Sequence, residues 1–193
     1  LYQSVMFLPY FLSWIIVSYL AYSLFSIESG FINKTIIAGL GMEPVKWYFE
    51  PKYWPFILTF FQLWKYTGYN VVVYLAAITG IDGEYYEAAE IDGANAVDKF
   101  FKITIPAISP IFFFNLVTGT INSLNTSFAL IYPLTGGGPG KATQVMSLDI
   151  YVNAFKNFRM GYASAEAVIL FAITAALSLL QFRLAKKWVY YEA

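Results

Sequence analysis

Residues 87–110 read Glu-Ala-Ala-Glu-Ile-Asp-Gly-Ala-Asn-Ala-Val-Asp-Lys-Phe-Phe-Lys-Ile-Thr-Ile-Pro-Ala-Ile-Ser-Pro. This stretch predicts a short helix, a break and a second helix. Gly93 suits a position of positive φ at which a helix ends. The second helix is expected to have one largely apolar face, because Val97, Phe100, Phe101 and Thr104 recur at i, i+3, i+4 and i+7. Pro106 is expected to restart the chain as the next helix.

Long apolar runs flank this stretch on both sides. A helix needs roughly 20 apolar residues to cross the hydrocarbon core of a membrane. Four segments have this length, at about 5–25, 55–81, 107–132 and 163–184. Pro9 lies near the start of the first, where a helix tolerates proline best. The second contains Lys65, and the fourth has Glu166 near its entrance. The sequence therefore predicts an all-α, multi-pass integral membrane protein.

The composition agrees with this class and excludes others. The chain is 59% hydrophobic and 12% charged, with a mean hydropathy of +0.57, whereas soluble domains carry about 25% charge. Lipid is therefore the expected surroundings of this chain. Twelve basic residues balance twelve acidic ones, so nothing indicates a nucleic acid partner. The absence of cysteine and histidine excludes disulfides, Cys/His zinc sites and Cys or His catalysts.

Charge alone leaves the orientation in the membrane open. Four spans would place 26–54 and 133–162 on one side, and 82–106 with both chain ends on the other. Cytoplasmic loops normally carry the excess of Lys and Arg, but five basic residues fall on one side and six on the other. Only the compact cluster in 183–187 favours its own side.

Two predicted spans carry polar stripes. Amides in hydrocarbon are costly unless they are paired or wetted, so the stripes either join helices or line a solute path. Helix joining is the simpler explanation for any single residue. Sugars are recognised by amides and stacked aromatics, which favours a path for the set as a whole. On the span at 55–81 the stripe comprises Gln62, Tyr66, Tyr69 and Asn70. On the span at 107–132 it comprises Asn115, Thr118, Asn122 and Asn125, with Gly119, Ser123 and Thr126 beside them.

The spacing of residues 87–106 resembles a known motif. Glu87-Ala-Ala89, two residues, Asp92-Gly-Ala94 and a later Ile103-x-x-Pro106 resemble the EAA loop of permease subunits in binding-protein-dependent ABC importers. The resemblance implies that 82–106 is a cytoplasmic coupling loop that docks into a cleft of a separate ATPase subunit. It then implies that 26–54 and 133–162 face the cell exterior. The docking residues implied are Glu87, Ala88, Ala89, Asp92, Gly93 and Ala94.

Further stretches are similar to the carbohydrate-uptake, maltose-type permeases of this class. They are Phe7-Leu-Pro9, Gly30-Phe-Ile-Asn33, Leu134-Thr-Gly-Gly-Gly-Pro139, Ala154-Phe155 and Gly161-Tyr-Ala-Ser-Ala165. The resemblance covers nearly the whole chain and implies the helical bundle of such a permease, a single transmembrane domain with a six-helix core. Since four spans are visible and the chain begins at Leu1 without a signal peptide, we expect two further helices to precede it.

The resemblance also implies function and partners. The chain would be one half of a pore that imports a carbohydrate, an oligosaccharide above all, across the bacterial cytoplasmic (inner) membrane. Its partners would be a second permease subunit, two ATPase subunits and an extracytoplasmic solute-binding protein, in addition to membrane lipid. ATP and Mg would bind the ATPase, with no cofactor and no catalysis in this chain.

Other interpretations need features that are scarce here. An ion-coupled secondary transporter is the main alternative and would need intramembrane acids or paired broken helices. Only Lys65 and Glu166 are candidates. A membrane enzyme would need a nucleophile with its base. An exporter or channel would be excluded if transport were shown to depend on a solute-binding protein.

The glycine-rich run at 136–143 is a false phosphate loop. That motif needs G-x-x-x-x-G-K followed by Ser or Thr. Thr135 stands where its first glycine belongs, and Ala142 follows Lys141. The run is either a turn-rich outer loop or a contact for the solute-binding protein.

Overall fold

The computed structural model describes residues 2–125 and 127–190, and these ranges contain helices and loops but no strand. The all-α prediction is confirmed. The elements in chain order are α1 (Tyr2–Phe7), the 3-10 turn η1 (Leu8–Phe11), α2 (Trp14–Phe25), the π-helix η2 (Ile32–Ile37), the 3-10 turns η3 (Trp47–Phe49) and η4 (Pro51–Tyr53), α3 (Trp54–Thr79), α4 (Gly83–Ile91), α5 (Ala96–Lys99), the π-helix η5 (Phe100–Thr104), α6 (Ile105–Asn125), α7 (Ser127–Leu134), α8 (Met146–Tyr151), the π-helix η6 (Val152–Lys156) and α9 (Met160–Ala185).

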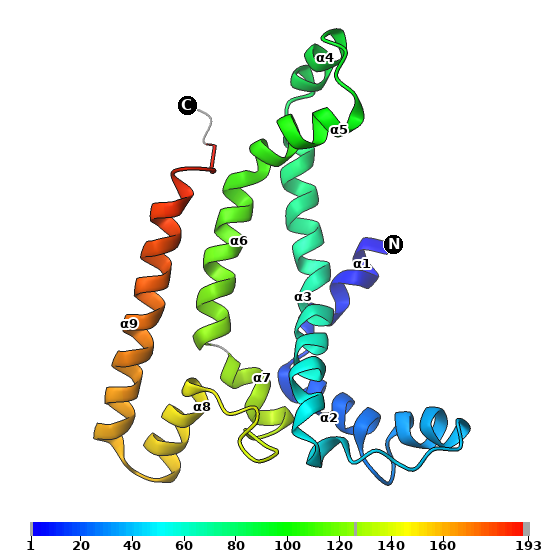
Figure 1. Cartoon of the computed structure of the whole chain (residues 1–193), viewed down its shortest axis with the longest axis vertical. Helices are drawn as coiled ribbons and strands as arrows, with labels where there is room; N and C mark the ends of the chain where they lie inside the picture. Colours follow the sequence, from blue (N-terminus) through cyan, green and yellow to red (C-terminus); the bar gives the residue numbers. More distant parts are fainter. Residues whose placement is uncertain (1, 126, 191–193) are drawn as a thin grey trace.

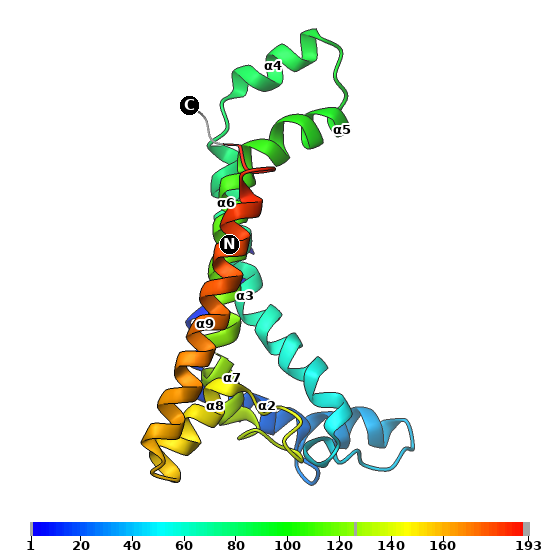
Figure 2. The same ribbon diagram turned by 60° about the vertical axis from the view of Figure 1, so that its left-hand side comes forward.

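Three long helices set the length of the molecule. In Figure 1, α3, α6 and α9 run along its long axis, and α6 packs against both of the others. The hairpin of α4 and α5 projects at one end, and α9 ends on the same side. The opposite end carries α2, α7, α8 and the excursion at 26–54, as both Figure 1 and Figure 2 show. The buried core around Val17, Trp54 and Phe61 lies in this part of the chain.

Within residues 2–125 and 127–190, two continuous helical runs are long and apolar enough to cross a membrane, at Ala96–Asn125 and Met160–Ala185. The first joins α5, η5 and α6. Pro106 is the second residue of α6, as expected for a proline at the start of the next helix, but no break in the helical run precedes it. Proline lacks an N–H and crowds the carbonyl four residues earlier. The wider π turn of η5 stands directly before it, which lets the helix continue. The described part of this run reaches Asn125, and α7 follows from Ser127; Thr126, between them, lies outside the described residues.

The helix α3 has the length of a span, about 39 Å for its 26 residues. By hydropathy it is not among the helices apolar enough to cross a membrane, because polar side chains occupy its middle. They include the stripe Gln62, Tyr66, Tyr69 and Asn70, together with Lys65 and Thr67.

The segment predicted as one helix over 5–25 is sharply bent. Val5–Phe11 and Trp14–Phe25 meet at 107°. Leu12 and Ser13 are extended between them, and the Ser13 hydroxyl accepts the Ile16 N–H at 3.3 Å to cap α2. The bend leaves α1 beside the middle of α3 (Figure 1). The first described residues therefore lie beside the middle of α3 rather than beside the loop at 82–106.

Lys65 stabilises this bend. Its side chain is 5% exposed, near the middle of α3, and its ammonium donates to the carbonyls of Pro9 at 3.3 Å, Tyr10 at 2.8 Å and Leu12. These carbonyls lie at the break, where the helical pattern of hydrogen bonds is interrupted. Unpaired backbone groups are expensive in a membrane interior. The lysine thus acts as an internal cap for a broken helix.

One turn further along α3, Gly68 lets α1 approach closely. A Cβ at this position would lie 1.8 Å from the carbonyl oxygen of Met6 and 2.9 Å from the nitrogen of Phe7. Both neighbours are backbone atoms and cannot rotate away. The contact between α1 and α3 therefore requires glycine.

We predict that Gly68→Ala separates α1 from α3 and lowers the thermal unfolding temperature of the purified complex. Overpacking of this kind costs about 1–3 kcal/mol. The control is Gly161→Ala in α9, where a Cβ meets nothing within 4 Å. An equal melting temperature for both variants would contradict the packing described here.

Candidate functional site

The first helix of the loop at 82–106 ends as the sequence predicts. Gly93 has φ +78°, which a side chain would strain. Its N–H donates to the Glu90 carbonyl at 3.0 Å, and the Ala94 N–H donates to the Ala89 carbonyl at 2.9 Å. These two bonds form a Schellman motif, in which the last carbonyls of α4 find donors.

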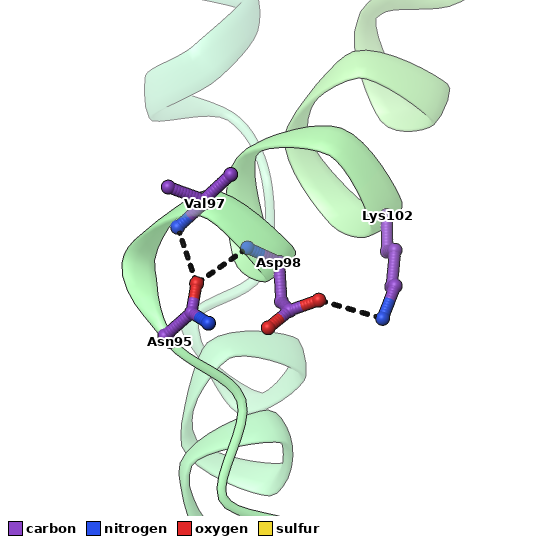
Figure 3. A network of polar contacts seen from close by, with 4 residues as sticks. All are labelled: Asn95, Val97, Asp98 and Lys102. Atoms are coloured by element: carbon purple, nitrogen blue, oxygen red, sulfur yellow. Dashed lines mark hydrogen bonds and ion pairs between the residues drawn. The ribbon is translucent and has the colours of Figure 1, made fainter.

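The second helix starts at a cap that the sequence reading missed. The Asn95 side-chain oxygen accepts the N–H groups of Val97 at 2.9 Å and Asp98 at 3.0 Å (Figure 3). Asp98 then receives the Lys102 ammonium at 2.7 Å, one turn later on the same helix. An asparagine directly before an apolar helical run is a recognisable N-cap signal, so this residue was open to prediction.

Two contacts tie the arms of the loop together. The Lys99 ammonium lies 2.5 Å from the Glu90 carboxylate, joining the start of the second helix to the end of α4. This hydrogen bond and the positive charge hold the pKa of Glu90 below its ordinary value. The Tyr86 hydroxyl lies 2.9 Å from the hydroxyl of Thr104, which is buried. The loop is thus a braced hairpin.

The face that the loop presents to its surroundings is mixed. Glu87, Ala88, Asp92 and Gly93 are exposed, while Ala89 and Ala94 are half-buried. Beside them Ile91 is 89% exposed, which the sequence reading did not single out. A projecting surface of small, acidic and apolar groups can receive a partner protein, with the carboxylate available to an arginine. Its role in docking stays a prediction.

The apolar face predicted for the second helix is only partly right. Val97, Phe100 and Phe101 are exposed, but Thr104 is buried. The π turn of η5 takes more residues than an α turn. Spacing that assumes a regular α-helix therefore misplaces Thr104.

A cavity of about 570 Å³ lies between α3 and α6, and the two polar stripes line it. Nine of the eleven predicted path residues meet there: Gln62, Tyr66, Tyr69, Asn70, Asn115, Thr118, Gly119, Asn122 and Ser123. The volume falls in the usual range for small-molecule sites. The stripes thus face each other, while their function as a solute path stays a prediction.

The two remaining residues lie elsewhere. Asn125 lines a second cavity of about 540 Å³ between α6, α8 and α9, and its amide donates to the Ile121 carbonyl at 2.9 Å. Asn125 therefore lies apart from the other stripe residues, and its role in a solute path stays a prediction. Thr126 lies outside the described residues.

Tyr10 completes the first cavity from a third segment. It comes from η1, and its ring stacks on Tyr69 at 4.7 Å between centroids, with 14° between the planes. It also meets the edge of Tyr66 at 5.8 Å. The sequence reading missed Tyr10 because it assumed one continuous helix over 5–25. Thr67 and Tyr74 of α3 also line the cavity and follow from the helical spacing of the stripe.

The glycine-rich run forms a closed turn. The Thr143 hydroxyl donates to the Gly138 carbonyl at 2.8 Å and lies 2.7 Å from the Thr135 hydroxyl. The Gly137 N–H donates back to the Thr135 oxygen at 3.3 Å. These polar groups bind each other, as expected of a turn-rich loop.

We predict that Lys99→Met loosens the hairpin, because it removes the contact between its arms. Amide hydrogen exchange of residues 83–91 should become severalfold faster. Lys102→Met is the matched control, since its partner Asp98 lies on the same helix. If both variants accelerated exchange in α4 alike, the bridge would not brace the loop.

Comparison with known proteins agrees with this geometry. A family described as the binding-protein-dependent transport system inner membrane component matches residues 1–190. The lactose transport system permease protein LacF of Rhizobium radiobacter is 36% identical over 97% of this chain and 63% of its own length. The sn-glycerol-3-phosphate transport system permease protein UgpA of Brucella abortus is 40% identical over 67% of this chain and 44% of its own.

A solved structure shares the fold. A chain in the crystal structure of a bacterial alginate ABC transporter, in complex with a periplasmic protein bound to alginate pentasaccharide, superposes with a TM-score of 0.87. The sequence identity is 26%, covering 99% of this chain and 66% of that one. The chain thus spans less than two thirds of the length of these relatives. It belongs to the family of binding-protein-dependent transport system inner membrane components.

Proposed function

We propose that this chain is a pore-forming subunit of an ATP-driven importer of a carbohydrate, in particular an oligosaccharide, in the bacterial inner membrane. One observation carries the proposal. The helical run Ala96–Asn125 begins in the braced loop and continues as a wall of the 570 Å³ cavity. A partner that moved the loop would move that wall.

The family and the loop support a proposal for the partners. The proposed assembly contains a second permease subunit, two ATPase subunits that bind ATP and Mg, and an extracytoplasmic solute-binding protein. The docking residues are Glu87, Ala88, Ala89, Asp92, Gly93 and Ala94. The amide and tyrosine lining of the cavity supports a sugar as the substrate. Two of the similar proteins are named as parts of a lactose transport system and an alginate transporter, which agrees with this.

The mechanism is alternating access. ATP binding would close the ATPase pair, shift the docked α4 and tilt α6 against α3, turning the cavity outward. Hydrolysis would restore the inward state. Such a cycle needs only that the nucleotide and the sugar bind the two states differently.

The ion-coupled alternative is not favoured. Lys65 is engaged by three backbone carbonyls, and the Glu166 carboxylate accepts the Asn153 amide at 3.1 Å. The relatives are also subunits of binding-protein-dependent or ABC systems.

We expect Gly93→Pro to uncouple ATP hydrolysis from uptake in the reconstituted transporter. Proline cannot adopt φ +78°, so the docking surface would be distorted while the membrane helices fold. Gly83→Pro is the control, because Gly83 is the first residue of α4, where proline is well tolerated. Normal uptake by the Gly93 variant would remove the loop from the coupling mechanism.

Sugar binding in the cavity is tested by Gln62→Ala and Asn122→Ala. Each should raise the KM for uptake about two- to tenfold, since one hydrogen bond contributes roughly 0.5–1.5 kcal/mol. Asn125→Ala is the control on the same helix, outside the cavity. Unchanged KM in the double variant would mean that the sugar binds elsewhere.

A further inference from the structure

We propose that Lys65 is a positioning residue for sugar binding, which acts by holding the Tyr10 ring in the cavity wall. The inference rests on the proposed function of the cavity as a sugar site. Lys65 is not among the described residues that line the cavity. Its effect on a sugar must therefore pass through the segment that it holds.

The contact between Lys65 and this segment satisfies both sides. An ammonium has three N–H donors, and three carbonyls accept them, those of Pro9, Tyr10 and Leu12. Removing the ammonium would take this donor from the Tyr10 and Leu12 carbonyls, whereas the Pro9 carbonyl also accepts the Leu12 N–H at 3.2 Å. Removing the break would leave a buried charge unpaired. The Trp14 ring lies 5.3 Å from the same ammonium and adds a cation–π contact.

The same contact fixes the position of Tyr10. Its carbonyl is bound at 2.8 Å, so its backbone is held between a proline and the capped start of α2. Its ring then stacks on Tyr69 and meets Tyr66 on α3, the helix that supplies the lysine. Lys65, Tyr66 and Tyr69 follow one another over little more than one turn. The lysine and the aromatic pair thus form one unit.

A stacked tyrosine pair in a cavity wall offers a flat apolar surface, with its hydroxyl groups able to bind at the edge. The carbon-bound hydrogens on one face of a sugar ring suit such a surface, while the neighbouring amides suit its hydroxyls. A displaced Tyr10 would therefore weaken sugar binding more than it would slow the transport cycle.

The test is a double-mutant cycle on the complete transporter in proteoliposomes. Lactose, maltotriose and oligogalacturonide would first be screened, and the sugar that most stimulates ATPase activity would be the probe. Lys65→Met and Tyr10→Ala are each expected to raise the KM for uptake about tenfold with kcat nearly unchanged. The double variant should be no worse than either single one, because Lys65 acts through Tyr10.

Lys65→Arg is the second variant, for use if the transporter carrying Lys65→Met does not assemble. It keeps the charge but brings a planar fork of donors to carbonyls arranged around one nitrogen. It should assemble, raise KM, and lose this effect in the Tyr10→Ala background. Lys186→Met, at an exposed position after α9, is the control for loss of a lysine.

The outcomes separate this inference from the proposed function. The inference would be overturned if the increases in KM caused by the Lys65 and Tyr10 variants multiplied in the double variant. It would also be overturned if assembled Lys65 variants kept a normal KM while Gln62→Ala raised it. In either case the cavity would remain the sugar site. If Gln62→Ala and Tyr10→Ala both left KM unchanged, the cavity would not be the sugar site and both proposals would fall.

Discussion

The pairing of backbone carbonyls with the Lys65 ammonium is the interaction on which the arrangement of this chain depends. A helix crosses a membrane easily because its backbone groups bind each other, and a break exposes some of them. Here the break at Leu12 and Ser13 is supported by a charge from another helix. A lysine in a membrane is itself costly, by about 3 kcal/mol near a helix centre on insertion scales. The carbonyls thus offset the cost of burying the ammonium, and the ammonium offsets the cost of leaving the carbonyls unpaired. The resulting bend places Tyr10 against α3.

The second organising feature is the continuity of the run Ala96–Asn125. The helix needs neither a hinge nor a loop between the projecting hairpin and the cavity wall. Its irregularities include the π turn of η5, which is held by the Tyr86–Thr104 contact, and Pro110 inside α6. In the proposed mechanism, a displacement at the hairpin would pass along this continuous helical run to the cavity wall.

The sequence was sufficient for features that depend on local spacing. Gly93 predicted the end of α4, and the helical recurrence of Gln62, Asn70, Asn115 and Asn122 predicted two faces that the structure brings into one cavity. These patterns repeat with the geometry of a helix and need no knowledge of distant contacts.

Local sequence patterns do not predict features that depend on contacts between residues far apart in the chain. Pro9 near the start of a helix is ordinarily harmless, and only the lysine more than fifty residues later makes the break after it stable. Tyr10 was overlooked for the same reason. Thr104 was misplaced because a π turn leaves no simple trace in the spacing of apolar residues.

The contact at Gly68 bears on how the chain enters the membrane. During synthesis, residues 2–25 leave the ribosome well before Lys65 and Gly68, the two residues against which they settle. Until α3 arrives, the Tyr10 and Leu12 carbonyls lack the Lys65 ammonium as a donor, and unpaired carbonyls are costly away from water. The arrangement of the first segment described here therefore depends on a helix that is translated after it.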